Sequence, residues 1–280
     1  MDLLSEWLAT QETFPQCLGP RLLESFREGK ASAMEGLVRF EKGSSFLAWS
    51  TGFFEQDTQE PIAALWGWDG ERKAEFLSRS LRELDCSLMV ELAAGDPDGA
   101  LLKECGFVLE RYRLSLTPRE HALDTPQQGR YSLRLATDLD RALLCTLAAD
   151  YAEFTLPAGQ SHRLSQYTTS ILARYREVDY GPDSAVDLFV AEEDHLAAGY
   201  ILVELMDDGT LYLEDIGVKR SHWGKYVAQF LIRAAENIMV AHGIDLLWCE
   251  ISSANRRSFV TAVRSLRFEP RVEIWMRRRL

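Results

Sequence analysis

The stretch that decides the fold of this chain is TLYLEDIGVKRSHWGKYVA, at residues 210–228. Its first half reads as a strand, and from residue 227 apolar side chains recur at helical spacing. A strand that enters a helix through a short polar loop creates an anion site, because the first amides of the helix have no internal partner and its dipole adds positive potential. Lys219, Arg220 and Lys225 add positive charge. The segment therefore predicts a site for a diphosphate.

The rest of the chain after residue 130 predicts an alternation of helices and strands around that segment. Thr137 and Asp140 form a capping box for a first helix, on which Leu139, Leu143 and Leu147 share a face. The remaining expected elements are strands at 131–135, 185–191, 198–205, 210–218, 244–251 and 272–276, a hairpin turn at 207–209, and helices at 165–175, from Val227 to just before Gly243, and after a cap at Asn255.

The loop itself resembles a known motif. Aligned on the helix, WGKYVA at residues 223–228 is similar to the Arg/Gln-x-x-Gly-x-Gly/Ala loop of the GNAT superfamily of N-acetyltransferases, with Trp223 in place of Arg/Gln and Tyr226 in place of the first glycine. Downstream, residues 252–269 resemble the family's closing asparagine, helix and Gly-Phe turn, with Arg267 where glycine is usual. The resemblance extends over residues 131–280.

The N-terminal half carries a weaker resemblance to the same family. A strand-like stretch at 85–92 is followed by a closing helix that ends at Gly106-Phe107, and then by a strand at 108–116. The place of its phosphate loop, residues 66–73, follows no family pattern. The resemblance implies a degenerate copy of the fold whose expected role is structural.

These observations predict the fold class and the domain division. Residues 117–130 hold two prolines, a glycine and few apolar side chains, which is the composition of a linker. We therefore expect an α/β (α+β) chain of two GNAT-like domains, residues 1–116 and 131–280, each a mixed, mostly antiparallel sheet flanked by helices.

The resemblance also implies a cosubstrate, acetyl-CoA or another acyl-CoA, and no metal. By this resemblance, its diphosphate would bind at the helix entrance and Asn255 would approach its pantetheine arm, with a plain helix cap as the alternative role of Asn255. The residues that the resemblance assigns to this cosubstrate are Ile216, Gly217, Val218, Trp223, Gly224, Lys225, Tyr226, Val227, Ala228 and Asn255.

Acyl transfer to an amine needs a base, because an alkylammonium ion does not attack a thioester. Glu214 and Asp215 lie on the strand beside the expected cleft, and adjacent strand positions face opposite ways. We choose Glu214 as the base, directly or through a water, with a solvent-facing or helix-capping role as the alternative. Glu250 on the neighbouring strand is a second candidate.

The departing thiolate benefits from an acid, which in the family is a tyrosine on the closing helix. Counting along the chain places Ala262 or Val263 there, and neither donates a proton. Tyr226 or Tyr212 could take that role, although core or rim packing is the commoner use of such aromatics.

Composition narrows the remaining function classes. The net charge of −12 argues against a nucleic-acid partner, no apolar run is long enough to span a membrane, and the N-terminus lacks an export pattern. Five scattered cysteines argue against a disulfide framework or a zinc site and fit a cytoplasmic protein. We expect a small amine or a protein amino group as acceptor, and a monomer or weak homodimer. The alternative is a catalytically inactive binding or assembly module, which Trp223, Tyr226 and the missing acid favour.

Overall fold

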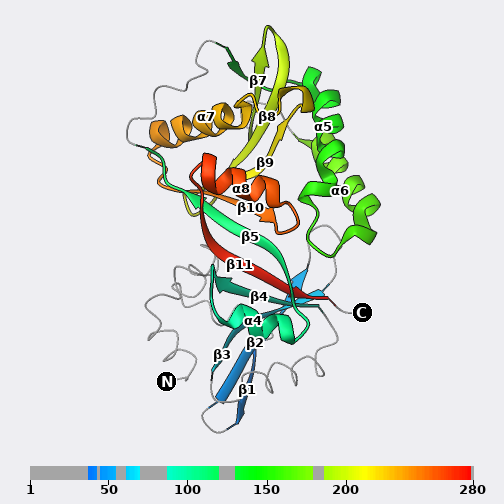
Figure 1. Cartoon of the computed structure of the whole chain (residues 1–280), viewed down its shortest axis with the longest axis vertical. Coiled ribbons are helices and arrows are strands. Elements are labelled where there is room, and N and C mark those ends of the chain that lie inside the picture. The colour runs from blue at the N-terminus through cyan, green and yellow to red at the C-terminus, as the bar shows by residue number, and fades with distance from the viewer. Residues whose placement is uncertain are drawn as a thin grey trace. The chain divides into compact units, whose positions relative to one another are not determined.

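The structure, a computed structural model, describes residues 37–42, 45–54, 61–69, 87–119, 130–178 and 186–278. The chain divides into two compact units, the first made of Met1–Tyr112 and Arg271–Leu280 and the second of Arg113–Pro270. Each unit is built on a mixed, mostly antiparallel sheet with helices beside it (Figure 1). This architecture agrees with the predicted fold class.

The first unit is a sheet of four N-terminal strands closed by the last strand of the chain. β1 and β2 pair antiparallel, β2 and β3 pair antiparallel, β3 and β4 run parallel, and β11 pairs antiparallel with β4. Its buried core includes Val90, Leu102, Phe107 and Trp275. The elements are β1 (Leu37–Lys42), β2 (Ser45–Phe54), β3 (Pro61–Asp69), β4 (Ser87–Ala93), α4 (Asp98–Glu104), the first half of β5 (Val108–Leu116) and β11 (Glu269–Arg277).

The two units exchange their closing strands. β11 ends the chain but pairs with β4, from Val272 opposite Ala93 to Arg277 opposite Leu88. The second half of β5, from Arg113 onward, belongs to the second unit, where β5 neighbours β10 in the strand order. The predicted division into residues 1–116 and 131–280 differs from these units, because pairing between segments far apart in the chain leaves no mark on local composition.

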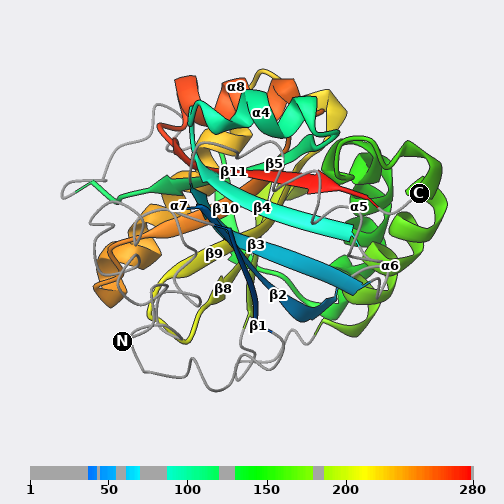
Figure 2. The ribbon, with the colours of Figure 1, turned by 90° about the horizontal axis from the view of Figure 1, so that it is seen from below.

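The elements that the sequence predicted after residue 130 are present in the same order, and all of them except the last strand belong to the second unit. Its strands follow the order β5-β10-β9-β8-β7-β6, and β9 and β10 are parallel while β6 to β9 are antiparallel. Helices α5 and α6 cover one face of the sheet and α7 the other (Figures 1 and 2). The elements are β6 (Ser132–Leu135), α5 (Arg141–Thr155), α6 (Leu164–Glu177), β7 (Val186–Glu193), β8 (Leu196–Leu205), β9 (Leu211–Val218), α7 (Val227–His242), β10 (Leu247–Ser252) and α8 (Arg256–Ser265).

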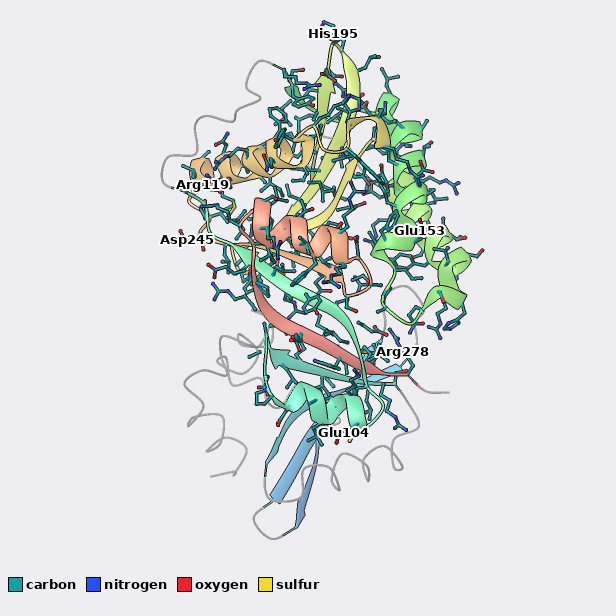
Figure 3. The ribbon with its side chains drawn as sticks, in the orientation of Figure 1. Glu104, Arg119, Glu153, His195, Asp245 and Arg278 are labelled. Atoms are coloured by element: carbon teal, nitrogen blue, oxygen red, sulfur yellow. The ribbon has the colours of Figure 1, made fainter. Side chains whose placement is uncertain are left out.

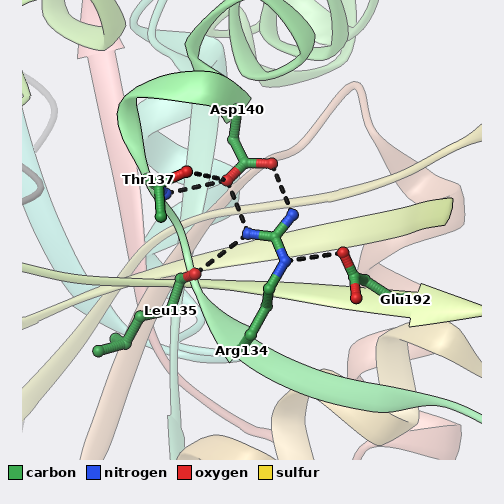
Figure 4. Close-up of polar contacts among 5 residues, drawn as sticks. All are labelled: Arg134, Leu135, Thr137, Asp140 and Glu192. Atoms are coloured by element: carbon green, nitrogen blue, oxygen red, sulfur yellow. Dashed lines mark hydrogen bonds and ion pairs between the residues drawn. The ribbon is translucent and has the colours of Figure 1, made fainter. Parts of the chain in front are cut away.

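The predicted capping box stands where β6 turns into α5 (Figure 4). Asp140 Oδ2 accepts hydrogen bonds from the amide and the hydroxyl of Thr137, at 2.9 and 3.2 Å. Arg134 forms a bidentate ion pair with the same carboxylate, with N–O distances of 2.7 and 2.8 Å. Arg134 also donates a hydrogen bond to Glu192 on β7 at 2.7 Å. The guanidinium keeps the pKa of Asp140 below its usual value, so the capping charge persists. The pair thereby fixes the start of α5 against the sheet.

The predicted apolar stripe of α5 is confirmed at Leu147 and wrong at Leu139, while Leu143 packs partly buried against the same core. Leu139 lies in the short 3₁₀ turn of Asp138–Asp140 and is 93% exposed. The side chains that α5 buries are Leu144, Leu147, Ala148 and Ala152. The turn before the helix resets the helical phase, which a count from Thr137 misses.

Two hairpin turns shape the β7–β9 ribbon. Asp194 and His195 join β7 to β8 with φ values of 51° and 64°, as a two-residue turn with both residues left-handed requires. His195 marks the tip of this hairpin in Figure 3. The predicted turn at 207–209 is also present, where Gly209, at φ 78°, donates its amide to the Met206 carbonyl.

Arg267 stands at the turn where the family has glycine, and its φ of 65° is the conformation that glycine favours. Its side chain reaches the buried Glu236 of α7 at 3.0 Å. Arg233, at 2.6 Å, and Arg119, at 3.5 Å, approach the same carboxylate. The ion-pair cluster offsets part of the backbone cost of an arginine at this turn.

Candidate functional site

The two central strands of the second unit separate part-way along their length. β9 and β10 pair over three residues only, Leu211 with Leu247, Tyr212 with Trp248 and Leu213 with Cys249. β9 nevertheless continues to Val218 and β10 to Ser252. From Glu214 onward, the edge of β9 that faces β10 is therefore not paired with β10.

A β-bulge coincides with the point of separation. Val203 of β8 lies opposite Leu213 and Leu202 lies opposite Asp215, so that Glu214 is the extra residue. Bulges bend a strand and break the alternation of its side chains. The bulge in β9 has both effects. Glu214 forms an ion pair with Arg174 and Asp215 accepts a hydrogen bond from Tyr175, although Arg174 and Tyr175 are consecutive residues of the same helix, α6.

The two carboxylates therefore do not face opposite ways, which corrects the reasoning that selected Glu214. The assumption of strict alternation was wrong at this point of β9, since the bulge brings both side chains to the α5–α6 face. Glu214 remains the half-buried carboxylate at the mouth of the separation. Its ion pair with Arg174 had no counterpart in the sequence reasoning.

Asp215 sits in a buried network of hydroxyl groups. Its Oδ2 accepts hydrogen bonds from Tyr175 at 2.5 Å and from Tyr200 at 2.7 Å, and the two hydroxyls lie 3.2 Å apart. Burial, with Asp215 close by, raises the pKa of both phenols well above the usual value, so they stay protonated donors. Oδ1 accepts the Ile216 amide at 2.8 Å. Asp215 is therefore a positioning group for the end of β9.

The backbone groups of Ile216 and Val218 point into the separation. Lys219 donates its amide to Ala198 of β8. Because neighbouring residues of a strand direct their polar groups to opposite sides, Ile216 and Val218 direct theirs away from β8. The Val218 carbonyl accepts the indole N–H of Trp223 at 2.8 Å and the hydroxyl of Tyr151. This edge is thus capped by side chains where β10 has moved away.

Gly217, on the same stretch, is required by a close approach. A Cβ atom at this position would lie within the ring of Tyr200, whose side chain is fully buried. Any larger residue would displace Tyr200 and the Asp215 network that it belongs to. Gly217 was predicted as a residue of the cosubstrate site, and packing against Tyr200 gives it a second reason to be glycine.

The loop between β9 and α7 presents backbone amides to solvent. Gly224 at φ 75° and Tyr226 at φ 68° are both left-handed, and α7 begins at Val227. In the described part of the chain, no acceptor is bonded to the amides of Gly224, Tyr226, Val227 or Ala228. The predicted helix entrance with unused donors is therefore present.

Two contacts hold this loop from outside. The Lys225 carbonyl accepts the hydroxyl of Tyr131 at 3.0 Å. His222 Nε2 lies 3.0 Å from Glu193 Oε2 on β7, and Glu193 is bonded to Arg130 at 2.6 Å. These contacts join the loop to Tyr131 and Glu193, which are remote from it in the chain, so no local pattern in the sequence indicates them.

Tyr226 occupies the position where the family motif has glycine, and its backbone conformation explains that preference. Its φ of 68° strains any residue with a Cβ, and its side chain is 55% exposed, so little packing offsets the strain. We expect Tyr226→Gly to stabilise the protein by about 1 kcal/mol, as measured by urea unfolding.

Gly224 offers the matched control for this prediction. With φ at 75° and no atom near its missing Cβ, Gly224→Ala adds strain without a clash. It should destabilise the protein by about 1 kcal/mol. A loss of stability in Tyr226→Gly instead would mean that the tyrosine ring contributes more by contact than its backbone costs.

Trp223 replaces the Arg/Gln of the motif and is held on three sides. Beyond its bond to Val218, its ring lies 6.4 Å from that of Tyr151, and the guanidinium of Arg257 stands 4.3 Å from the ring centre. Burial raises the pKa of Tyr151, which keeps its hydroxyl a donor. The indole thus packs against the end of β9, and Arg257 of α8 lies over its ring.

The remaining predicted residues lie on or beside α8 and β10. The Asn255 side chain accepts the Ser258 amide at 3.1 Å, so its predicted role as a helix cap is confirmed. Glu250 pairs with Arg113 of β5 at 2.9 Å. Ala262 lies on the buried face of α8, and its methyl group supplies no acid at this position. Tyr151, Asp215 and Arg257 are site residues that the sequence did not single out.

Within the described ranges, no helix combines the length and apolarity to cross a membrane, and no group of three His, Cys, Asp or Glu side chains is placed to hold a metal ion.

Comparison with known proteins agrees with this geometry. Residues 151–259 match the acetyltransferase (GNAT) family model, whereas no curated protein matches the chain. A functionally unknown conserved protein from Staphylococcus epidermidis is similar in structure, with a TM-score of 0.55 at 13% identity over 88% of this chain and 96% of that one. A GCN5-related N-acetyltransferase from Sphaerobacter thermophilus gives a TM-score of 0.50 at 14% identity over 90% and 85%.

Identities this low show a shared fold and nothing finer. The family match adds to it, because the matched residues include the separating strand β9, the loop and α7 within one compact unit. Residues 151–259 of the second unit therefore match the acetyltransferase (GNAT) family model in the segment where the fold has the site described above.

Proposed function

We propose that this protein is an acyl-CoA-dependent N-acyltransferase that uses acetyl-CoA and transfers the acyl group to an amine. The observation that carries the proposal is the separation of β9 from β10, which leads directly to the unbonded amides at the start of α7. The arm that carries the thioester can lie along the edge of β9 that β10 leaves unpaired. The diphosphate of the same molecule can then bind the amides at the start of α7.

The residues of the site fit such a donor. Acetyl-CoA supplies the acyl group as a thioester, and its diphosphate carries negative charge. The loop offers the amides of Gly224, Tyr226, Val227 and Ala228, with the charge of Lys225 beside them. Binding along β9 would exchange the Asp215 cap on the Ile216 amide and the Tyr151 cap on the Val218 carbonyl for bonds to the pantetheine arm, an exchange of similar hydrogen bonds that leaves the Trp223 bond in place.

Glu214 is the base in this proposal. It stands on the bulge where the separation begins, on the α5–α6 face, so an amine approaching from that face meets its carboxylate. The Arg174 guanidinium favours the ionised carboxylate, which is the form that accepts a proton. The proton leaves the ammonium for the Glu214 carboxylate, and the nitrogen lone pair then attacks the thioester carbon. The C–S bond breaks, CoA leaves as a thiolate, and the thiolate takes up the second proton that the nitrogen loses as the amide forms.

Calorimetric titration of the whole chain with acetyl-CoA, followed by longer acyl-CoAs, tests the donor. We expect saturation at micromolar concentration. Gln229→Glu is the matched control, because it changes only the charge in the first turn of α7. It should weaken binding about tenfold by repelling the diphosphate, while an acidic residue there stabilises the helix by about 0.3–1 kcal/mol. A flat titration with every acyl-CoA would overturn the proposal.

The second candidate function is a catalytically inactive GNAT-fold binding or assembly module. It is favoured by the capping of the Val218 carbonyl by Trp223 and Tyr151, and by the apolar Ala262 where an acid would stand. A flat titration would support this candidate.

If the protein is an enzyme, Tyr226, exposed at the loop, and Tyr212 on β9 are the remaining proton donors for the leaving thiolate.

The first unit is inferred to be a degenerate copy that binds no cosubstrate. In support, it repeats the succession of antiparallel strands, a parallel strand, a short helix and a closing strand that the second unit has. Residues 66–69 of its expected phosphate loop lie in β3, and residues 70–73 are outside the described part of the chain. We further infer a cytoplasmic monomer or weak homodimer that acts on a small amine or a protein amino group, without nucleic acid or membrane.

A further inference from the structure

Arg257 faces the loop from outside it. It lies in the first turn of α8, and its guanidinium carbon stands 4.3 Å from the centre of the Trp223 ring. A cation at this distance from an indole face is held there by the ring's electrostatics. Arg220, at 5.9 Å from the same ring, is the weaker of the two contacts.

The position of this guanidinium is set by fixed elements. Asn255 caps α8 through the Ser258 amide, which fixes where the first turn of the helix begins. Trp223 is bonded to the Val218 carbonyl and packs beside Tyr151, which fixes the ring. Arg257 is therefore held beside the loop by two independently anchored partners.

Arg257 differs from many other arginines of the described ranges in having no carboxylate partner there. Many arginines of this acidic chain lie against carboxylates, among them Arg113, Arg134, Arg174 and Arg233. Among the residues that the structure describes, no carboxylate forms an ion pair with Arg257, although the net charge of the chain is −12. A guanidinium that has no carboxylate partner and lies beside a loop with unbonded backbone amides is suited to bind a phosphate oxygen.

We propose that Arg257 binds the diphosphate of the acyl-CoA donor, and that Trp223 holds it in place to do so. The loop position that carries Arg or Gln in the GNAT motif is Trp223 here, so the side-chain donor comes from α8 instead of from the loop. The inference rests on the proposed function, since it concerns a residue of the same donor site.

Calorimetry with acetyl-CoA tests the assignment, using Arg257→Ala against Arg256→Ala. Both arginines are exposed and lie in the same turn of α8, but they point in different directions around the helix. We expect Arg257→Ala to weaken acetyl-CoA binding about ten- to hundredfold, as the loss of a charge-assisted contact does, and Arg256→Ala to change it less than about twofold. Equal effects of the two variants would overturn the proposal, because they would mean that only general charge matters.

Dephospho-CoA, which lacks the 3′-phosphate but keeps the diphosphate, identifies the phosphate concerned. The loss in Arg257→Ala should be the same with dephospho-CoA and with CoA. If the loss disappears with dephospho-CoA, Arg257 binds the 3′-phosphate and the assignment to the diphosphate is overturned.

Variants of Trp223 test the supporting role. Trp223→Phe keeps an aromatic face for the guanidinium and should retain most of the affinity, whereas Trp223→Ala should lose about as much as Arg257→Ala. In the double variant Trp223→Ala/Arg257→Ala the two losses should not add, and full additivity would overturn the supporting role. Failure of the unaltered chain to bind any acyl-CoA would instead overturn the proposed function.

Discussion

Residues 131–280 expressed alone are expected to fail to fold, even though they contain the whole segment that resembles the family. The fragment lacks residues 113–119, which carry the buried Leu114 and Leu116 of the second unit and its pair between Arg113 and Glu250. Each buried leucine contributes about 1.5–3 kcal/mol, against a total domain stability of about 5–15 kcal/mol. The fragment also separates β11 from its partner β4, which exposes Val272, Ile274 and Met276.

Circular dichroism and size-exclusion chromatography check this prediction. The fragment should aggregate or lack a cooperative thermal transition. The matched control is the chain cut between residues 119 and 130 with both pieces co-expressed, which breaks the same connection but retains both exchanged strands. The two pieces should copurify and unfold cooperatively. A stable, soluble fragment with a transition near that of the intact chain would show that the exchanged strands are dispensable.

Glu214→Gln is expected to reduce turnover at neutral pH by at least about 100-fold, in the range that general base catalysis contributes. The amide keeps the size of the carboxylate and a hydrogen-bond acceptor for Arg174, but it does not take a proton from the amine. The dissociation constant for acetyl-CoA should be unchanged, because Glu214 lies in the middle of β9, before the edge at Ile216 and Val218 and before the loop. Release of free thiol with a panel of primary amines measures the effect.

Glu250→Gln is the control for this variant. Glu250 is a carboxylate on the neighbouring strand and is likewise paired with an arginine, Arg113. The proposal expects a small effect there and a large one at Glu214. Unchanged turnover in Glu214→Gln would remove it as the base, and a large loss in Glu250→Gln alone would transfer the role to that residue.

The order of elements in the second unit could be predicted because each depends on neighbours in the chain. The strand, loop and helix at residues 210–228, the cap at Asn255 and the left-handed end of α7 at Gly243 all follow from spacing and local backbone chemistry. Such features depend on contacts between residues a few positions apart, so the local sequence pattern predicts them. The departures from the motif, Trp223 and Tyr226, were visible for the same reason.

What the sequence did not determine involves residues far apart in the chain. The bulge at Glu214 depends on how β8 and β9 pair, and it turned two carboxylates to one face against the simple alternation. The buried carboxylate of Glu236 forms ion pairs with Arg119, Arg233 and Arg267, and no local sequence pattern indicates this cluster.

The sequence by itself therefore determined the strand-loop-helix segment with its unused amides, because backbone donors at a helix start are a local property. Only the tertiary structure decided that β11 closes the first unit, that part of β5 belongs to the second, and that Arg257 stands over Trp223. These outcomes depend on pairing and packing between segments separated by tens of residues or more. Strand pairing joins backbone groups that every residue carries, so the side-chain pattern of one strand leaves its partner undetermined.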